Sequence, residues 1–375
     1  MGKLHPEPTE TIILEVGAYE TRIGFAGEKQ PRYIIPTVVA DSREPLFSPT
    51  HLKSLTEVSP LLYFGKDAVK KNQVLKLHYF IANDNYSFLE SFLKYCGNLL
   101  GVEFADHSLV YLHHTNLPES KKEALKSLFL FKLGCQQLAF LNQSTAVLTV
   151  IDADTGVLID LGEKESRIDT IYKGYPNLSA YQEFSIGGQR LTAEFLNKLY
   201  AQGVYGTKKP YEFYVNQIKE QLAVCVMDYE GALQKIEKGD TSLYQEVVFP
   251  DQNKAHLNAE RFEIVESYFR PELFNSSEES LPELAQKAVK SWDRTAQAEL
   301  LESIILYGGG SAIPGLVERL ENEIKRFFPK ILKINVHAYP EEPNLVWLGA
   351  SVLISQKVLT AWITREDLEK PQGGN

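Results

Sequence analysis

The sequence has few cysteines, no long apolar run and no surplus of basic side chains. Its three cysteines, Cys96, Cys135 and Cys225, are far apart and odd in number, so we expect a reducing compartment and no disulfide framework. No apolar stretch reaches the roughly 18 residues of a membrane-spanning helix, and residues 1–10 lack the apolar core of a signal peptide. The 39 basic and 49 acidic side chains give a net charge of −10, which argues against a protein that binds nucleic acid through its phosphate backbone.

The 375 residues, of which 44% are hydrophobic and 23% charged, are typical of a globular chain of about two domains. Strand-like and helix-like stretches alternate along the chain, which predicts an α/β fold. The predicted strands include residues 11–14, 109–112 and 157–159, and apolar residues recur at helical spacing over 88–99 and 316–328. Because no long linker divides the chain, we expect its domains to interleave.

One short pattern occurs twice. Residues 13–17 (Ile-Leu-Glu-Val-Gly) and 158–162 (Leu-Ile-Asp-Leu-Gly) each end a strand-like run, and second runs follow at 21–25 and 167–172. A carboxylate and a tight glycine turn at the end of a strand can aim backbone N–H groups at a phosphate, while the acid reaches a hydrated divalent cation. We interpret the pair as two phosphate loops of duplicated domains that face each other across a cleft. Two ordinary β-hairpins are the alternative.

A third element also consists of a strand that ends in glycine. Residues 304–307 form a buried-type strand that runs into Gly308, Gly309 and Gly310. Glycines after a strand allow a ligand to approach the backbone closely. The spacing fits neither a Walker loop nor a dinucleotide fingerprint. A plain structural turn is the alternative interpretation.

In their order and spacing, these elements resemble the actin family. The resemblance covers almost the whole chain, from about residue 11 to residue 368. The stretches that carry it are residues 24–28, 31–36, 63–68, 160–174, 218–222, 228–230, 308–315, 346–350 and 362–364. It implies an actin-like, two-lobed α/β fold with duplicated ribonuclease-H-like domains around a nucleotide cleft.

The resemblance also implies a division of the chain. The first lobe would comprise residues 11–150 and 338–368, with a small mobile subdomain at 41–74. The second lobe would comprise residues 151–337, with a subdomain inserted at 190–267. We expect the tail, residues 369–375, to be disordered.

By the same resemblance, the chain would bind ATP or ADP with Mg²⁺. The positions that match nucleotide-binding residues of the family are Glu15, Gly17, Arg22, Asp160, Gly162, Lys219, Glu220, Gly309 and Gly310. Asp160 would hold water around the metal ion, and Lys219 and Glu220 would touch the base and the ribose. An inherited scaffold that no longer binds nucleotide is the alternative.

Several positions depart from the family pattern. Glu15 stands where the family has aspartate, Tyr19 where it has glycine, and Leu161 where it has serine. The glutamine that positions the attacking water falls at Thr145, which is too short, and the nearby histidine falls at Arg167, which cannot act as a base. We therefore assign no catalytic residue and expect little or no ATP hydrolysis.

Within the family, residues 32–39, 160–166, 185–188 and 346–349 are similar to the class of actin-related subunit at the pointed end of dynactin. This implies a non-catalytic structural protein of the cytoplasm and cytoskeleton that caps a short actin-like filament. Its partners would be the filament subunits and the pointed-end dynactin subunits, which help to connect dynein to cargo. Neither a nucleic acid nor a membrane span is expected.

A proline-containing insert bears on capping. Residues 41–59 have a weak structural pattern and predict a mobile surface segment. Its prolines restrict the backbone conformations that docking of a further subunit would use. We hypothesise that the insert blocks filament growth and offers Leu46 and Phe47 to a partner. A merely variable loop is the alternative.

Two other functions remain open. An actin-related subunit of a chromatin-remodelling complex would show similar departures from actin. An ATP-dependent phosphotransferase of the same fold would need a carboxylate base, for which Asp169 or Glu163 could be proposed, and a sugar pocket that nothing in the sequence marks.

Overall fold

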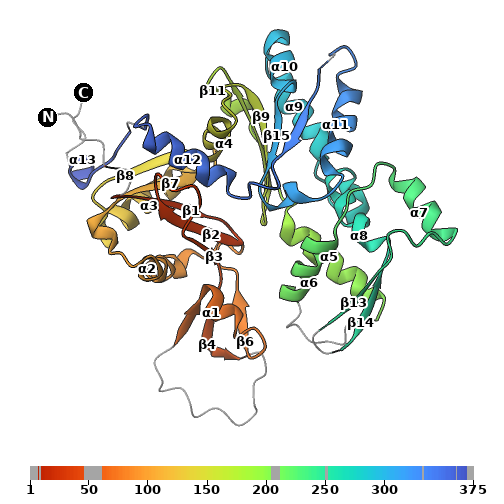
Figure 1. Cartoon of the computed structure of the whole chain (residues 1–375), viewed down its shortest axis with the longest axis horizontal. Coiled ribbons are helices and arrows are strands. Elements are labelled where there is room, and N and C mark those ends of the chain that lie inside the picture. Colours follow the sequence, from red (N-terminus) through yellow and green to blue (C-terminus); the bar gives the residue numbers. More distant parts are fainter. Residues whose placement is uncertain are drawn as a thin grey trace. The chain divides into compact units, whose positions relative to one another are not determined.

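A computed structural model describes residues 7, 10–45, 61–203, 212–249, 252–331, 333–359 and 361–369 (Figure 1). The chain forms two compact units. The first unit combines Met1–Ala153 with Asn344–Asn375, and the second is Asp154–Pro343. The first unit is therefore assembled from two separate stretches of the chain, one on each side of the second unit in sequence.

The main sheet of the first unit has the strand order β3-β2-β1-β7-β8. Its strands are β1 (Thr11–Val16), β2 (Glu20–Phe25), β3 (Tyr33–Pro36), β7 (Ser108–His113) and β8 (Leu138–Asn142). The β1–β2 and β2–β3 pairs are antiparallel, whereas β1–β7 and β7–β8 are parallel. Strand β1 is buried along most of its length, which is why it reads as a nearly continuous apolar run. The strands predicted at residues 11–14 and 109–112 are confirmed.

Helices pack around this sheet. They are α2 (Leu89–Leu100), α3 (Glu119–Lys126), α4 (Gln143–Val150), α12 (Leu345–Ser355) and α13 (Arg365–Glu369). Helix α2 packs against β2 and β3, and α12 packs against α4 and β1. Gly349 allows α12 to approach α4, because a Cβ atom there would stand 2.5 Å from the carbonyl carbon of Ala146. The second segment of the unit is thus anchored through a backbone-to-backbone contact.

A small sheet with the order β5-β4-β6 extends the first unit (Figure 1). Its elements are β4 (Val39–Pro45), β5 (Leu62–Phe64), α1 (Gly65–Val69) and β6 (Leu75–His78). The prediction of a mobile insert that begins at Asp41 is wrong for its first residues, which belong to β4. Asp41 is 2% exposed, pairs with Leu62 and accepts a hydrogen bond from Nε of Arg43 at 2.9 Å. The remainder of the insert, with Leu46 and Phe47, lies outside the described residues.

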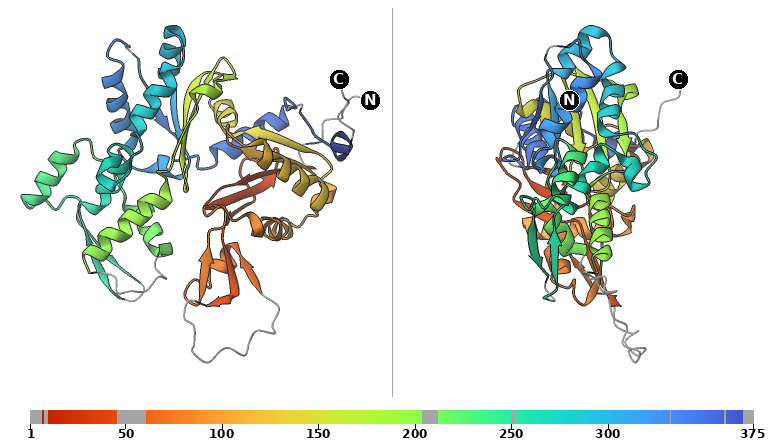
Figure 2. Two further views of the ribbon diagram at one scale, coloured as in Figure 1. Left: turned by 180° about the vertical axis from the view of Figure 1, so that it is seen from behind. Right: turned by 90° about the vertical axis from the view of Figure 1, so that its right-hand side faces the viewer.

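The main sheet of the second unit repeats this topology. Its order is β11-β10-β9-β15-β16, with β12 also paired to β10. The strands are β9 (Gly156–Leu161), β10 (Ser166–Tyr172), β11 (Tyr175–Pro176), β12 (Gln182–Phe184), β15 (Ile304–Tyr307) and β16 (Val336–Ala338). As in the first sheet, two antiparallel pairings are followed by two parallel ones. The pattern that occurs twice in the sequence therefore marks two sheets of the same connectivity, which Figure 2 shows from two further directions.

The second unit has more helices than the first in its described part. They are α5 (Gly188–Ala201), α6 (Glu212–Leu222), α7 (Tyr229–Glu237), α8 (Glu260–Glu263), α9 (Leu281–Lys290), α10 (Arg294–Leu301) and α11 (Leu316–Phe327). Helices α9 and α10 pack against β10, and α11 packs against α9 and β16. A separate hairpin of β13 (Gln245–Val248) and β14 (Lys254–Leu257) lies beside α5 and α6 (Figure 1).

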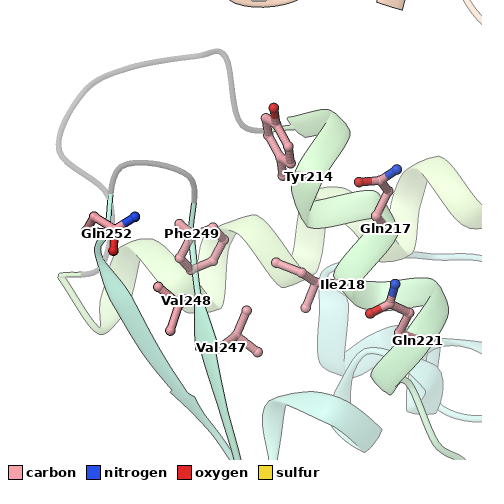
Figure 3. Close-up of a pocket in the computed structure, with 8 residues that line it drawn as sticks. All are labelled: Tyr214, Gln217, Ile218, Gln221, Val247, Val248, Phe249 and Gln252. Atoms are coloured by element: carbon pink, nitrogen blue, oxygen red, sulfur yellow. The ribbon is translucent and has the colours of Figure 1, made fainter.

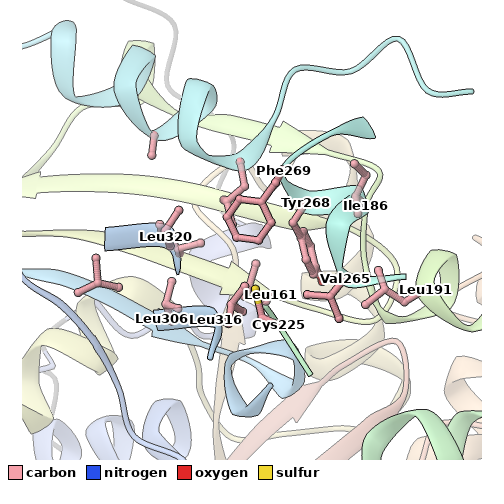
Figure 4. Close-up of a cluster of buried hydrophobic side chains, with 14 of the residues drawn as sticks. Leu161, Ile186, Leu191, Cys225, Val265, Tyr268, Phe269, Leu306, Leu316 and Leu320 are labelled. Carbon is pink, nitrogen blue, oxygen red and sulfur yellow. The ribbon is translucent and has the colours of Figure 1, made fainter. Parts of the chain in front are cut away.

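The core of the second unit lies between these helices and the sheet. Leu161 at the end of β9 is fully buried there, together with Tyr268, Leu306 and Leu316 (Figure 4). Cys225 is buried in this core, and burial raises the pKa of its thiol to about 12, so it is not a reactive thiolate at neutral pH. Along the stretches that the structure describes, every helix is too short or too polar to cross a lipid bilayer.

Candidate functional site

In the first unit, the acid that ends β1 faces an arginine on the neighbouring strand. Glu15 pairs directly with Arg22 in the β1–β2 register, and Oε1 of Glu15 lies 3.7 Å from Nη1 of Arg22. Nε of Arg22 donates a hydrogen bond to Oδ1 of Asn344 at 2.9 Å. Burial raises the pKa of Glu15, and the nearby Arg22 charge opposes that increase. Glu15 is thus held beside a positive side chain of its own hairpin.

The second unit has the same arrangement at the end of β9. Asp160 pairs with Arg167 in the β9–β10 register, and Oδ2 of Asp160 lies 3.3 Å from Nη1 of Arg167. Nε of Arg167 lies 3.2 Å from Oε2 of Glu183, and its Nη2 contacts the Glu165 carboxylate. Burial alone would disfavour the charged guanidinium, but these carboxylates outweigh it and raise the pKa of Arg167. Arg167 is therefore a fixed cation with three acidic neighbours.

The glycine turns of the two hairpins are also equivalent. A Cβ atom at Gly17 would stand 2.7 Å from the carbonyl oxygen of Glu20, and one at Gly162 would stand 2.8 Å from that of Glu165. The N–H of Gly17 donates to this Glu20 carbonyl at 3.0 Å. Both glycines are thus required by the hairpin turns themselves. This geometry accounts for them whether or not a phosphate binds nearby.

Two of the residues that depart from the family pattern make contacts within the protein. The ring of Tyr19 stacks on Tyr79, which follows β6, with centroids 6.3 Å apart and planes 13° apart. Leu161 is fully buried in the core of the second unit (Figure 4). Neither side chain offers the small polar surface that serine or glycine would give a phosphate loop. These contacts show what the departures from the family pattern do locally.

The three glycines after β15 have different surroundings. Gly308 has a φ of 80°, and a Cβ atom there would stand 2.5 Å from Oδ1 of Asp160. At Gly310, a Cβ atom would stand 2.8 Å from Cβ of Leu161. Gly309 has no heavy atom within 4 Å of the equivalent position. Packing against β9 thus explains Gly308 and Gly310, whereas a side chain at Gly309 would meet no neighbouring atom.

Lys219 on α6 is bound into the packing of α6 against α5. The residue is 7% exposed, and its Nζ donates to the Gly188 carbonyl at 2.8 Å and to Oγ1 of Thr192 at 2.9 Å. Burial lowers the pKa of Lys219, while the Glu163 charge opposes the decrease. Because Gly188 also abuts the Glu163 carboxylate, the structure brings Lys219 close to the loop that follows Gly162.

Glu220 lies at the other end of a chain of hydrogen bonds that begins at Lys219. Oγ1 of Thr192 donates to Oδ1 of Asn216 at 3.0 Å, and Nδ2 of Asn216 donates to Oε1 of Glu220 at 2.7 Å. The same helix borders a surface hollow of about 410 Å³, which has no ionisable group other than a tyrosine (Figure 3). Its lining residues are Tyr214, Gln217, Ile218, Gln221, Val247, Val248, Phe249 and Gln252. The hollow does not include Lys219 or Glu220, and its lining contains no carboxylate, histidine or lysine.

Helix α4 begins with a buried glutamine two residues before Thr145. The helix begins at Gln143, which is 5% exposed, while Thr145 is exposed and its N–H donates to the N-cap Oδ1 of Asn142 at 3.1 Å. A buried glutamine therefore opens the helix on which we assigned the water-positioning place to Thr145. The strand-to-helix boundary at Asn142 was the available signal. The expected loss of hydrolysis, which we based on Thr145 and Arg167, stays a prediction.

The donor set around Asp160 can be compared with what a divalent cation requires. Mg²⁺ binds oxygen ligands in near-ideal octahedral geometry and keeps several waters. At Asp160, a guanidinium already lies beside one carboxylate oxygen. In the described ranges of the chain, no three His, Cys, Asp or Glu side chains gather as metal ligands. The guanidinium thus competes with a cation for Asp160, and the magnesium role that we expected of this residue stays a prediction.

The fold and these loops define a duplicated, mixed α/β protein in which each half carries a carboxylate–glycine hairpin. The sequence profile of one family, described as Actin, matches residues 6–209 and 207–373. The chain belongs to the actin family, whose members generally bind an adenine nucleotide with a divalent cation. The predicted fold class and the family resemblance are confirmed.

Proposed function

We propose that this chain is a non-catalytic, actin-related structural subunit that caps the pointed end of the short actin-like filament of dynactin. In this role it helps to connect dynein to cargo in the cytoplasm. Family membership supports assembly with actin-like subunits. The stretches 32–39 and 160–166, which are similar to the pointed-end class, support the particular complex.

The observation that carries the non-catalytic assignment is the environment of Arg167. Phosphoryl transfer to water requires a group that orients or deprotonates the nucleophile in line with the γ-phosphate. Arg167 stands where the family resemblance places a histidine, and its guanidinium is engaged by Asp160, Glu165 and Glu183. A permanently protonated guanidinium cannot accept the proton of an attacking water.

The proposal includes an adenine nucleotide as a structural ligand. Gly309 leaves the loop backbone open, and the polar chain from Lys219 to Glu220 supplies a cation and a carboxylate. A ligand that binds only the folded state at a concentration of 1,000 times Kd stabilises that state by about 4 kcal/mol. Retention of ATP would therefore serve stability without turnover.

Capping is assigned to the segment that follows β4. The strand ends at Pro45, whose backbone has no N–H to extend the ladder. We propose that the insert, through Leu46 and Phe47, contacts a pointed-end partner and prevents addition of another subunit. This part of the proposal rests on the sequence, because both residues lie outside the described residues.

A filament-growth assay tests the capping function. Purified full-length chain is added to actin-like filaments whose barbed ends are blocked, and pointed-end elongation is followed by single-filament microscopy. We expect elongation to stop, and we expect Leu46→Ser with Phe47→Ser to weaken recruitment of the pointed-end partners. The matched control is Leu61→Ser with Val74→Ser, which changes two exposed apolar residues of the small-sheet region. Continued elongation, or equal effects of both double variants, contradicts the capping proposal.

Two further measurements separate the competing functions. Native co-purification should recover dynactin subunits, and recovery of chromatin-remodelling subunits instead would replace the proposed complex. Incubation with ATP and a panel of sugars should release neither ADP nor phosphate above a buffer blank. Sugar-dependent ADP release would identify a phosphotransferase, and sugar-independent phosphate release would contradict the non-catalytic assignment.

A further inference from the structure

Each hairpin of the duplicated fold pairs its loop carboxylate with an arginine on the adjacent strand. Glu15 lies opposite Arg22, and Asp160 lies opposite Arg167, at the same sequence separation. In both cases the guanidinium is within 4 Å of the carboxylate. Each candidate phosphate loop therefore contains a positive charge supplied by the chain itself.

Arg167 is the more firmly held of the two arginines. Its side chain is 13% exposed and meets Asp160, Glu165 and Glu183 through three different nitrogens. Glu183 is itself held, because the hydroxyl of Tyr181 donates to Oε2 of Glu183 at 2.6 Å. A guanidinium has five N–H donors in a planar fork, so about two remain for an anion after these contacts.

This arrangement competes with a divalent cation for the same carboxylate. A metal ion drawn to Asp160 would stand beside the Arg167 guanidinium, and the two positive charges would repel each other at short range. Removal of the guanidinium from Asp160 would also leave a buried arginine with one acidic partner fewer. Asp160 thus already has a positive counter-ion that cannot dissociate, which it shares with Glu165 and Glu183.

We propose that Arg167 is a resident cation that takes the electrostatic place of Mg²⁺ at Asp160, so that this chain binds ATP without a divalent cation. The inference rests on the nucleotide binding included in the proposed function. Arg167 acts by neutralising Asp160 and by presenting its remaining N–H groups to an anionic phosphate. The alternative is that Arg167 merely satisfies three acidic side chains and has no effect on nucleotide binding.

Titration with a fluorescent N-methylanthraniloyl ATP tests the inference on the full chain. Kd is measured in excess MgCl2 and in excess EDTA, and for the wild type we expect the two values to agree within about twofold, or less than about 0.5 kcal/mol. Arg167→Gln removes the charge, and we expect its Kd in EDTA to rise at least about tenfold over its Kd in MgCl2. Arg167→Lys keeps a positive charge and should show a smaller dependence on Mg²⁺ than Arg167→Gln.

Arg326→Gln provides a matched control. It removes one positive charge from α11 of the second unit, on a side chain that is 71% exposed and outside this cluster, while Arg167 and Asp160 remain. We expect its ratio of Kd values to match that of the wild type. Thermal melts without nucleotide establish that each variant is folded. If Arg167→Gln does not fold, the comparison of wild type with Arg167→Lys decides.

Each outcome separates the inference from the proposed function. A wild-type Kd at least about tenfold weaker in EDTA than in MgCl2 overturns the inference but leaves nucleotide binding in place. Equal ratios for the wild type and both Arg167 variants overturn the role of Arg167. A wild type that binds the analogue in neither buffer overturns both the inference and the nucleotide part of the proposed function. Filament capping is scored independently by the elongation assay.

Discussion

The contact between α12 and α4 makes Gly349→Ala a sharp test of how the first unit is assembled. Gly349 lies within α12, and a Cβ atom there would stand 2.5 Å from the carbonyl carbon of Ala146 and closer still to its oxygen. Backbone atoms cannot rotate away as the end of a flexible side chain can. The added methyl group therefore has to push one helix away from the other.

The magnitude follows from two opposing effects. In an unconstrained helix, replacement of glycine by alanine stabilises the fold by about 1 kcal/mol. Overpacking of a tight core costs roughly 1–3 kcal/mol and occasionally more. Here the displaced helix carries Trp347 and Ala350, which are fully buried, so its movement opens space elsewhere in the core. We expect a net loss of about 3 kcal/mol, despite the favourable helix propensity of alanine.

Thermal unfolding followed by circular dichroism measures this effect. For a unit of this size, a loss of about 3 kcal/mol corresponds to a decrease in Tm of roughly 6–12 °C. The control is Gly101→Ala at the C-terminus of α2, where φ is 76° and no heavy atom lies within 4 Å. Its cost is limited to left-handed backbone strain of about 1–2 kcal/mol. A Tm for Gly349→Ala equal to or above that of Gly101→Ala would refute the steric argument.

Three further predictions concern the second unit. Gly309→Ala should leave Tm unchanged and weaken binding of the fluorescent ATP analogue. Gly310→Ala should lower the stability by about 2 kcal/mol, because its methyl group meets Leu161. Equal Tm values for the two variants would contradict this expectation. Leu161→Ser should cost about 3 kcal/mol in urea unfolding, since it empties part of a packed core, and an unchanged unfolding midpoint would exclude this reason. Burial raises the pKa of Glu266 from 4.5 to about 6, so the folded state binds a proton more readily than the unfolded state between these values. The wild type should therefore lose stability relative to Glu266→Gln as the pH rises through that window, with no further relative change at higher pH; a relative gain would contradict the assignment.

Local sequence patterns predicted the framework of the fold, because the spacing of apolar residues reflects which faces of a strand or helix are buried. Strand β9 is buried on both faces, so it appears in the sequence as an apolar run that ends in an acid and a glycine. The glycines at Gly17 and Gly162 were recognisable because a hairpin turn leaves no room for a Cβ atom. Because the same pattern occurs in two parts of the chain, the sequence already indicated a duplicated fold.

The sequence did not reveal which residues contact each other when they are far apart in the chain. The extension of β4 past Asp41 depends on a pairing with Leu62, which is distant in the chain, and on an ion pair with Arg43. The sequence also did not show which residue opens α4, because that depends on where β8 ends. Partners across strands follow from register, and local propensity does not fix register.

The substitutions at Leu161 and Arg167 have a common physical consequence. Leu161 packs in the core beneath Gly310, so the loop after β15 is seated on β9 by apolar contact. Arg167 joins Asp160 to Glu165 and Glu183, so the hairpin is held by ion pairs internal to the chain. Both arrangements hold the hairpin and the neighbouring loop through side chains of the protein itself. A hairpin that is ordered by its own side chains does not need nucleotide turnover to set its conformation, and this supports the capping role that we propose.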